Sequence, residues 1–330
     1  MKTKAVRFPE ANKYDVVELT LDAPGAGDIA VKTLVTAISP GTERWILRGK
    51  HVGTEFPCVP GYHRIGIVET CGADVTGFKP GDIVYGSGNR WEETDIISMW
   101  GAHVGYSVSS PEGYTLISSE SPDIPMLSKC AFIIVVGVAN RGINALQPQE
   151  GEHIAIIGGG IIGICAAQLS ALRGAIPTVI ELDQDRIALI EKMGINVING
   201  ADPDVLDKIK EISPDGLDIL YDSVGHAATT DNLVTQMKSG SRLLLQAQYF
   251  DKERCALDID AIKIKEITIK TTIGIDDKDF QETLDNISSG RLDIDSLITH
   301  CFKAPGDVLK GYELLDSGKP FNLGIVFEWE

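Results

Sequence analysis

The chain has 330 residues, of which 43% are hydrophobic and 23% are charged, as expected of a folded protein with about two domains. Thirty lysine and arginine residues stand against 47 aspartate and glutamate residues, so the net charge is −17. A surface this acidic repels phosphate backbones and anionic lipid headgroups, which argues against nucleic-acid binding and binding to membrane surfaces.

Residues 1–125 predict a β-rich domain. Short apolar runs such as IAVKTLVTAI, RIGIVETCG and GYSVSS are separated by glycine, proline and other turn residues. Pro80 and Gly81 form an expected turn before a strand at 83–85, because proline fixes φ and glycine permits positive φ.

Residues 126–272 predict an α/β domain. Strands that alternate with helices favour a doubly wound parallel sheet. The segment 262–270 alternates apolar and polar residues, so we expect an extended strand that closes the sheet edge or pairs with a second subunit. The other expected helices are 126–144, 161–172, 185–193, 204–210 and 232–237, and the other expected strands are 153–157, 177–181, 217–221 and 242–247.

Residues 273–330 predict a return to the β-rich domain. Two helices are expected, at 279–290 and 305–317, followed by a strand at 323–328. The α/β domain would then be an insertion in the β-rich one.

The location expected from the sequence is the cytoplasm. The first residues have no apolar segment typical of a secretion signal, and no apolar run approaches the length of a membrane span. The six cysteines include no CxxC pair, which favours reduced thiols over disulfides or a cysteine zinc site.

A glycine motif carries the strongest functional signal. The expected strand 153–157 is followed directly by GGGIIG, which fits the pattern G-x-G-x-x-G between a strand and a helix. Gly158 would make the tight turn, Gly160 would let a pyrophosphate approach the backbone, and Gly163 would let helix and strand pack closely. The amides at the helix start, including those of Ile161 and Ile162, would bind the phosphates.

An acidic residue accompanies this motif. Glu181 ends the next expected strand, 23 residues after Gly158. A carboxylate there accepts hydrogen bonds from the ribose 2′-hydroxyl and repels a 2′-phosphate, which favours NAD over NADP. Asp183 is the competing candidate for the ribose contact, and Arg186 in the following helix is a further cofactor-binding candidate.

Loops after two later strands are candidates for the nicotinamide side, because ligand contacts in doubly wound sheets gather at the carboxyl ends of strands. Each loop is equally compatible with an ordinary turn. Asn140, with Arg141 beside it, is a third candidate, from the first expected helix of the domain. The loop candidates are Ser223, Val224, Gly225 and Gln248.

Four stretches resemble elements of the medium-chain dehydrogenase/reductase superfamily. They are PGTE at 40–43, PGYHRIG at 60–66, GDIV at 81–84 and the glycine motif, which resemble C-G-T-D, P-G-H-E-x-x-G, G-D-x-V and G-x-G-x-x-G. The resemblance covers nearly the whole chain and implies a GroES-like catalytic domain, an inserted Rossmann domain and hydride transfer with NAD. It also implies a homodimer or a homotetramer.

The chain departs from the zinc-binding members of that family. Pro40 stands at the position of one zinc ligand with Ser39 beside it, Tyr62 stands at the second, and the third falls near Val136. Because catalytic zinc takes about three side-chain ligands, the resemblance implies a zinc-independent member with no metal. The stretch 38–44 resembles zinc-free members similar to bacteriochlorophyllide a dehydrogenase. No cysteine lies in 86–110, where a structural zinc lobe would be.

Side chains must then do what zinc does for the substrate oxygen. We expect Tyr62 and Thr42 to hold the oxygen, and His63 or His51 to relay the proton. The alternatives are that Tyr62 is only an aromatic wall and that His63 supports the site from behind.

Trp45 and His103 are candidates for substrate binding. Trp45 follows Thr42 on an expected helix, and His103 either faces the cleft or lies on a plain strand surface. For Glu43 and Arg44, a structural ion pair is expected rather than chemistry.

The sequence thus favours a zinc-independent, NAD-dependent alcohol or polyol dehydrogenase or carbonyl reductase. One alternative is a redox-neutral enzyme whose tightly bound NAD oxidises a hydroxyl transiently before elimination or epimerisation. Another is a nucleotide-binding protein without catalytic activity. An enoyl or quinone reductase fits less well, because those relatives usually prefer NADPH.

Overall fold

The computed structural model describes residues 1–120, 123–249, 256–317 and 322–330. They form two compact units, one made of Met1–Ile133 with Asp293–Glu330 and the other of Ile134–Leu292. The second unit is therefore inserted in the first.

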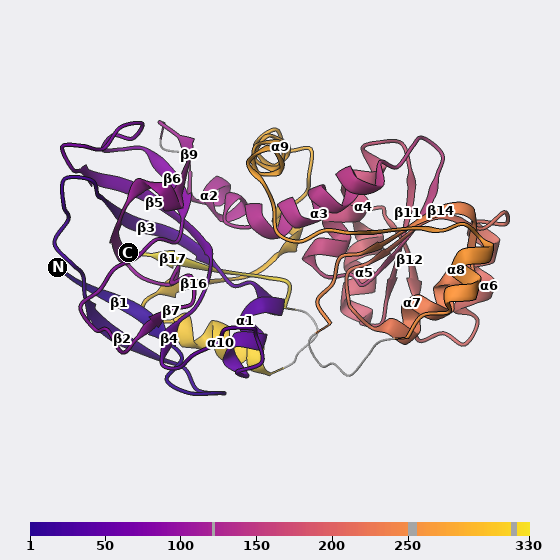
Figure 1. Ribbon diagram of the computed structural model, residues 1–330, viewed down its shortest axis with the longest axis horizontal. Coiled ribbons are helices and arrows are strands. Elements are labelled where there is room, and N and C mark those ends of the chain that lie inside the picture. The colour runs from indigo at the N-terminus through magenta and orange to yellow at the C-terminus, as the bar shows by residue number, and fades with distance from the viewer. Residues whose placement is uncertain (121–122, 250–255, 318–321) are drawn as a thin grey trace. The chain divides into compact units, whose positions relative to one another are not determined.

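The first unit is built on a seven-stranded sheet in the order β16-β17-β3-β5-β6-β9, with β8 also paired to β3 (Figure 1). The pairs are antiparallel except for β16 with β17. Two small sheets, β1-β2 and β4-β7, complete its described strands. The bounds are β1 Lys2–Arg7, β2 Asp15–Thr20, β3 Ile29–Ala37, β4 Cys58–Val59, β5 His63–Cys71, β6 Ile83–Gly86, β7 Ile97–Ser98, β8 Tyr106–Ser109, β9 Tyr114–Ser118, β16 Ile298–Ala304 and β17 Gly324–Trp329.

Three α-helices accompany these strands in the described part of the first unit: α1 (Pro40–Leu47), α2 (Ile124–Cys130) and α10 (Val308–Asp316). Short 3-10 helices lie at Pro111–Gly113 and Asp295–Leu297. The predicted strands 83–85 and 323–328 are confirmed as β6 and β17.

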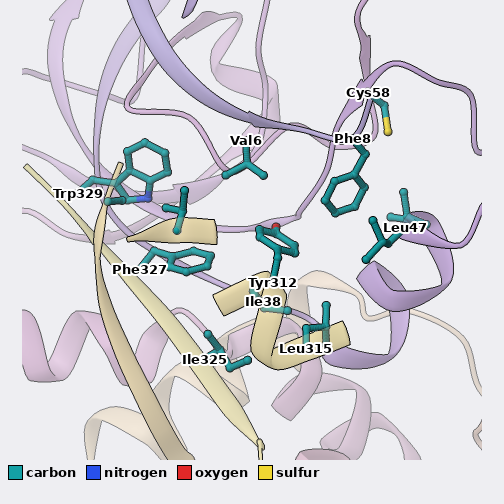
Figure 2. Close-up of a cluster of buried hydrophobic side chains, with 13 residues drawn as sticks. Val6, Phe8, Ile38, Leu47, Cys58, Tyr312, Leu315, Ile325, Phe327 and Trp329 are labelled. Atoms are coloured by element: carbon teal, nitrogen blue, oxygen red, sulfur yellow. The ribbon is translucent and has the colours of Figure 1, made fainter. Parts of the chain in front are cut away.

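The C-terminal residues complete the core of the first unit. Tyr312, Phe327 and Trp329 pack in one buried cluster with Val6 and Phe8 from the N-terminus (Figure 2). Burying this much aromatic and aliphatic surface is the main stabilising contribution that joins the two ends of the chain. The predicted return of the tail to the β-rich part is thus present in the structure.

The second unit contains a six-stranded, fully parallel sheet in the order β12-β11-β10-β13-β14-β15 (Figure 1). The predicted doubly wound sheet is confirmed. Its strands are β10 His153–Ile157, β11 Ile176–Glu181, β12 Asn196–Asn199, β13 Leu217–Asp222, β14 Met237–Leu245 and β15 Thr268–Thr271; its helices are α3 Ile133–Leu146, α4 Ile161–Ala171, α5 Gln184–Lys192, α6 Val205–Ile212, α7 Ala227–Val234, α8 Ile259–Ile264 and α9 Asp277–Ser288.

Helices cover both faces of this sheet. Leu220 and Leu243 cluster with apolar residues of α6, α7 and α8 on one face. Tyr221 and Leu244 point to the opposite face, because successive side chains of a strand alternate. There Gly142 of α3 approaches so closely that a Cβ would lie 2.7 Å from the Tyr221 hydroxyl.

The boundaries of the units differ from the predicted changes at 125 and 272. Helix α2 packs against β3 of the first unit. Helix α9 remains with the second unit, where Glu282 accepts a hydrogen bond from Asn140 of α3 at 3.0 Å. Neither packing partner could be recognised from local composition.

Three element predictions are wrong. The predicted helix 126–144 is divided into α2 and α3, which are bent by 48°. Residues 232–237 straddle the end of α7 and the start of β14. The predicted strand 262–270 begins as helix α8, because Asp258 caps that helix and positive φ at Glu266 ends it.

Within the residues that the structure describes, no single helix is long and apolar enough to cross a membrane. Helices α2 and α3 pass such a test only as a bent pair, by length and composition.

Candidate functional site

The turn between β10 and α4 has a backbone that depends on its glycines. Gly158 has φ +97°, a conformation that strains other residues. A Cβ on Gly163 would lie 1.9 Å from the carbonyl oxygen of Gly158, so only glycine lets α4 pack this closely. A Cβ on Gly160 would meet nothing within 4 Å. The space beside Gly160 is therefore open to a ligand.

Helix α4 begins beside this space. Its N-cap is Gly160, which offers no side chain to the first amides of the helix. The first N–H groups of a helix have no intrahelical acceptor and carry its positive partial charge. The amides of Ile161, Ile162 and Gly163 are thus suited to phosphate oxygens. Together with the open space at Gly160, they fit the pyrophosphate of a dinucleotide.

Glu181 lies at the carboxyl end of β11, against the glycine turn. Its Oε2 accepts a hydrogen bond from the Gly159 amide at 2.6 Å, and its Oε1 accepts from the amides of Leu182 at 2.6 Å and Asp183 at 3.0 Å. Asp183 instead caps α5, where its carboxylate accepts from the Arg186 amide at 2.9 Å. Of the two acids, Glu181 is therefore the one held on the turn.

Arg186 lies beside Glu181. Its guanidinium Nη1 is 3.7 Å from Oε2 of Glu181. The guanidinium is thus paired with the carboxylate that lies on the turn.

The loops after β13 and β14 border the glycine turn. A Cβ on Gly158 would lie 2.4 Å from the Val224 side chain, and a Cβ on Gly225 would lie 2.6 Å from the Gln248 carbonyl oxygen. The Ser223 hydroxyl donates to the Ile157 carbonyl at 2.6 Å. The structure therefore brings together the glycine turn and the loop residues expected to bind the cofactor.

Asp222, which the sequence analysis did not select, holds this loop. It is fully buried, and its carboxylate accepts hydrogen bonds from four donors. An acidic residue that ends a strand directly before Ser-Val-Gly is the signal that could have identified it. The donors are the amides of Val224 and Gly225, both at 2.9 Å, the Thr230 hydroxyl at 2.9 Å and the Tyr249 hydroxyl at 2.7 Å.

Asn140 and Arg141 contact helix α9. The Asn140 side chain is 2% exposed and donates to Glu282. Arg141 Nη1 lies 3.4 Å from the Asp279 carboxylate. Their contacts in the structure are thus with α9 rather than with the glycine turn.

The Tyr62 hydroxyl meets the hydroxyl of Ser39 in the first unit. The two oxygens are 2.5 Å apart, and the side chain of Thr42 is near enough to lower the pKa of the phenol. Ser39 is the N-cap residue of α1 but makes no side-chain cap bond, so its hydroxyl serves Tyr62 instead of the helix. The structure therefore assembles Tyr62 and Thr42 as expected and adds Ser39.

Burial sets the protonation state of Tyr62. It raises the pKa of the phenol above its ordinary value of 10.0, although the hydrogen bonds from Ser39 and Thr42 oppose this shift. The hydroxyl is thus protonated at neutral pH and can donate.

His63, a predicted proton relay, does not titrate in the neutral range. Its side chain is fully buried, with Nδ1 2.8 Å from the Tyr85 hydroxyl. Burial lowers the pKa of His63 to about 3, because a buried imidazolium is poorly solvated. The imidazole therefore remains neutral across the physiological range. Its ring lies 4.3 Å from the Tyr62 ring, so it supports Tyr62 by packing.

His103 is not at a surface that a substrate could contact. It is fully buried, as is Glu43, and its Nε2 lies 3.2 Å from the Glu43 carboxylate. The Glu43 carboxylate also accepts from the Ser39 amide at 2.9 Å and the Tyr312 hydroxyl at 2.7 Å. The expected pair of Glu43 with Arg44 is wrong, since Arg44 donates to the Leu315 carbonyl at 3.2 Å.

The remaining candidates, Trp45 and His51, lie on helix α1 and just after it. Trp45 of α1 is partly buried and carries the ammonium of Lys50 over its ring at 5.2 Å. His51 follows the helix, with its ring 5.5 Å from that of Trp100. Trp100 in turn lies 5.4 Å from Tyr62, a contact for which the sequence has no signal.

The side chains at the expected zinc positions do not fit a zinc ion. Pro40 has no donor atom, Val136 is a fully buried apolar residue, and Tyr62 offers a phenol in place of an imidazole. Zinc sites in proteins use cysteine, histidine and carboxylate ligands. Within the described ranges, no group of three or more such side chains is placed to hold a metal ion.

Comparison with known proteins gives matches in both units. A model of the family "Zinc-binding dehydrogenase" matches residues 162–289, and a model of the "Alcohol dehydrogenase GroES-like domain" matches residues 25–115. The 2-desacetyl-2-hydroxyethyl bacteriochlorophyllide A dehydrogenase of Cereibacter sphaeroides is 27% identical over 340 residues, covering 100% of this chain and 99% of that protein.

Solved structures show the same fold. An alcohol dehydrogenase from Escherichia coli CFT073, solved with NADH, aligns with a TM-score of 0.84 at 19% identity over 99% of each chain. A zinc-binding dehydrogenase homologue from Sinorhizobium meliloti 1021, solved with NADP, aligns with a TM-score of 0.82 at 19% identity over 99% of each chain.

Proposed function

The chain belongs to the medium-chain dehydrogenase/reductase superfamily, as an NAD(P)-dependent alcohol dehydrogenase, and from this premise we propose that it works with NAD and without zinc. Its substrate is a secondary alcohol, a polyol or a sugar hydroxyl, or the matching carbonyl. The observation that carries the proposal is the Ser39–Tyr62–Thr42 hydroxyl cluster, which stands where the zinc ligands of relatives are expected.

The hydroxyl cluster would handle the substrate oxygen. When bound, NAD accepts or returns the hydride, and the protein must stabilise or protonate the oxygen. Tyr62 donates its hydrogen bond to that oxygen, and in carbonyl reduction it gives up its proton to the developing alkoxide. Ser39 and Thr42 stabilise the tyrosinate left behind and pass a proton back to it. Alcohol oxidation follows the same steps in reverse.

His51 is the proposed contact with solvent for this proton. It is partly exposed, unlike the buried His63, and its ring adjoins Trp100, which contacts Tyr62. We therefore propose His51 as the relay, with water completing the path to the hydroxyl cluster because the indole between the two rings carries no proton. We assign to His63 the support of the Tyr62 ring.

Glu181 is proposed to select NAD over NADP. Its Glu181→Gln variant keeps one acceptor oxygen for the turn amides, turns an amide nitrogen toward the remaining donors, and loses the charge that repels a 2′-phosphate. We expect NADH binding to weaken about tenfold and NADPH binding to strengthen, so that the preference for NADH over NADPH becomes smaller. Fluorescence titration with both cofactors measures the two Kd values. Asp183→Asn is the matched control, because asparagine still caps α5; unchanged ratios in Glu181→Gln would contradict the assignment.

The proposed activity is tested by the absorbance of NADH. Enzyme dialysed against a chelator and checked for metal is given NAD and a panel of secondary alcohols, polyols and glycosides. Sustained NADH formation is the expected result. A requirement for added zinc would overturn the zinc-independent mechanism. A single burst equal to the enzyme concentration would identify the redox-neutral reaction, and NAD binding without any NADH would identify a nucleotide-binding protein.

A homodimer is the proposed assembly. Strand β15 is the edge of the six-stranded sheet, and the nearby side chains of Ile269 and Ile273 are 40% and 77% exposed. A strand edge beside exposed apolar residues is suited to pairing with a second copy.

We also place the protein in the reducing cytoplasm, since the five described cysteines are free thiols.

A further inference from the structure

Trp100 differs from the buried aromatic residues of the first unit. Its side chain is 41% exposed, whereas Trp329 at the end of the chain is 7% exposed. Among the large apolar residues classed as exposed in the described ranges, Trp100 is the aromatic one. An indole with this much free surface can still form contacts with a ligand.

The backbone at Trp100 is held in an unusual conformation. Its φ is +64°, which bulky residues rarely adopt, and such outliers persist where surrounding contacts enforce them. The residues on either side supply those contacts. The Met99 amide donates to the Val59 carbonyl and the Ala102 amide to the Gly61 carbonyl, both at 2.9 Å. Trp100 is thus tied to the segment that leads into Tyr62.

A buried arginine supports the same loop. Arg64 is fully buried, and its Nη1 donates to the Asn89 side chain at 3.2 Å. Asn89 in turn donates to the Gly101 carbonyl at 2.5 Å. The position of the Trp100 backbone is therefore determined from within the unit rather than by exposed side chains.

The indole adjoins the hydroxyl cluster. Its ring lies 5.4 Å from the Tyr62 ring at an angle of 78°, and 5.5 Å from the His51 ring at 75°. Edge-to-face packing of this kind fixes the orientation of the rings. A substrate whose oxygen is bound by Tyr62 would place its substituents within reach of the indole.

We propose that Trp100 determines specificity, as an aromatic wall for alcohols whose carbinol carbon carries a planar aromatic or conjugated group. The assignment rests on the proposed function, which places the substrate oxygen at Tyr62. A planar group stacks its π face closely on an indole, whereas a saturated ring of similar size is held farther away by its axial hydrogens and has no π face. The enzyme would therefore prefer 1-phenylethanol to 1-cyclohexylethanol, two secondary alcohols of nearly equal bulk.

The test compares kcat/KM for these two alcohols in four variants. Trp100→Leu and Trp100→Asn remove the aromatic face, and asparagine tolerates positive φ, so that at least one of them should fold. We expect both to lower the preference for 1-phenylethanol by about 2- to 10-fold. Trp100→Phe should keep most of the preference. Trp91→Phe is the matched control, because Trp91 is partly buried against a core cluster and donates to the Ile96 carbonyl at 2.8 Å.

A binding measurement separates this proposal from the proposed function. Calorimetry gives the affinity of both alcohols for the protein saturated with NADH, where no oxidation occurs. If no alcohol is oxidised but Trp100→Leu still lowers the binding preference, the alcohol dehydrogenase activity fails and the aromatic wall stands. The aromatic wall is overturned if Trp100→Leu shows the same preference for 1-phenylethanol as the wild type in both measurements. An equal loss of kcat/KM or of affinity for the two alcohols counts as the same preference.

Discussion

Replacing Tyr62 by phenylalanine is expected to lower the rate of carbonyl reduction by about 10²- to 10⁴-fold, the usual contribution of a general acid. The ring and its packing on His63 remain, and the phenol proton alone is removed. Affinity for NADH should be unchanged, since Tyr62 belongs to the first unit and the glycine turn to the second. Single-turnover reduction followed by NADH absorbance measures the effect on the chemical step.

The pH dependence of the wild type provides a second measure of the same role. Because burial raises the pKa of Tyr62 above 10.0, the hydroxyl holds its proton throughout the neutral range. The rate of reduction should therefore stay level from about pH 6 to pH 9 and fall only above the raised pKa. A fall centred near neutral pH would point to another proton donor.

The matched control for Tyr62→Phe is Tyr106→Phe. The Tyr106 hydroxyl is on β8, 3.4 Å from Glu69 in an exposed contact, so its removal should leave the rate within about twofold of wild type. Full turnover in Tyr62→Phe would mean that Tyr62 only lines the site with its ring and donates no proton.

The Rossmann unit was predictable because its signals are local. Strand, glycine turn, helix and acid follow one another in the chain between 153 and 181, and each position has a steric or electrostatic reason that a sequence can display. The roles of Gly158, Gly160 and Gly163 correspond to what an added Cβ would meet. The short apolar segments of the β-rich unit were recognised for the same reason.

The hydroxyl cluster was only partly predictable, because its chemistry depends on burial and on contacts across the sequence. His63 and His103 are ordinary titrating residues in a sequence, but the fold buries both completely. His103 lies 60 residues from its partner Glu43, and Tyr312 lies 269 residues from it. No spacing in the chain indicates these pairs. Ser39 shows the same limit, since an N-cap serine has the same sequence pattern whether it caps the helix or bonds to Tyr62.

Glu43 is expected to be the most sensitive position for stability. Its carboxylate is the acceptor for the Ser39 amide and the Tyr312 hydroxyl, and it adjoins His103. Glu43→Ala would leave these buried donors without an acceptor, and a protein interior offers no water to replace it. We expect the free energy of unfolding to fall by about 3–5 kcal/mol, as when one partner of a buried pair is removed. Urea unfolding followed by tryptophan fluorescence measures the change.

The Glu43→Gln variant keeps the shape of the side chain but removes its charge and one of its two acceptor oxygens. The amide oxygen still accepts one hydrogen bond, but the amide nitrogen opposes a second donor, so an intermediate loss of stability is expected. Glu10→Ala, which removes an exposed carboxylate paired with Lys13, should change the free energy by less than about 0.5 kcal/mol. If the free energy of unfolding of Glu43→Ala fell by less than about 1 kcal/mol, the stabilising role of this hydrogen-bond network would be contradicted.

Because Ser39 joins Glu43 to Tyr62, a folded Glu43→Gln enzyme should also turn over more slowly without a change in NADH affinity.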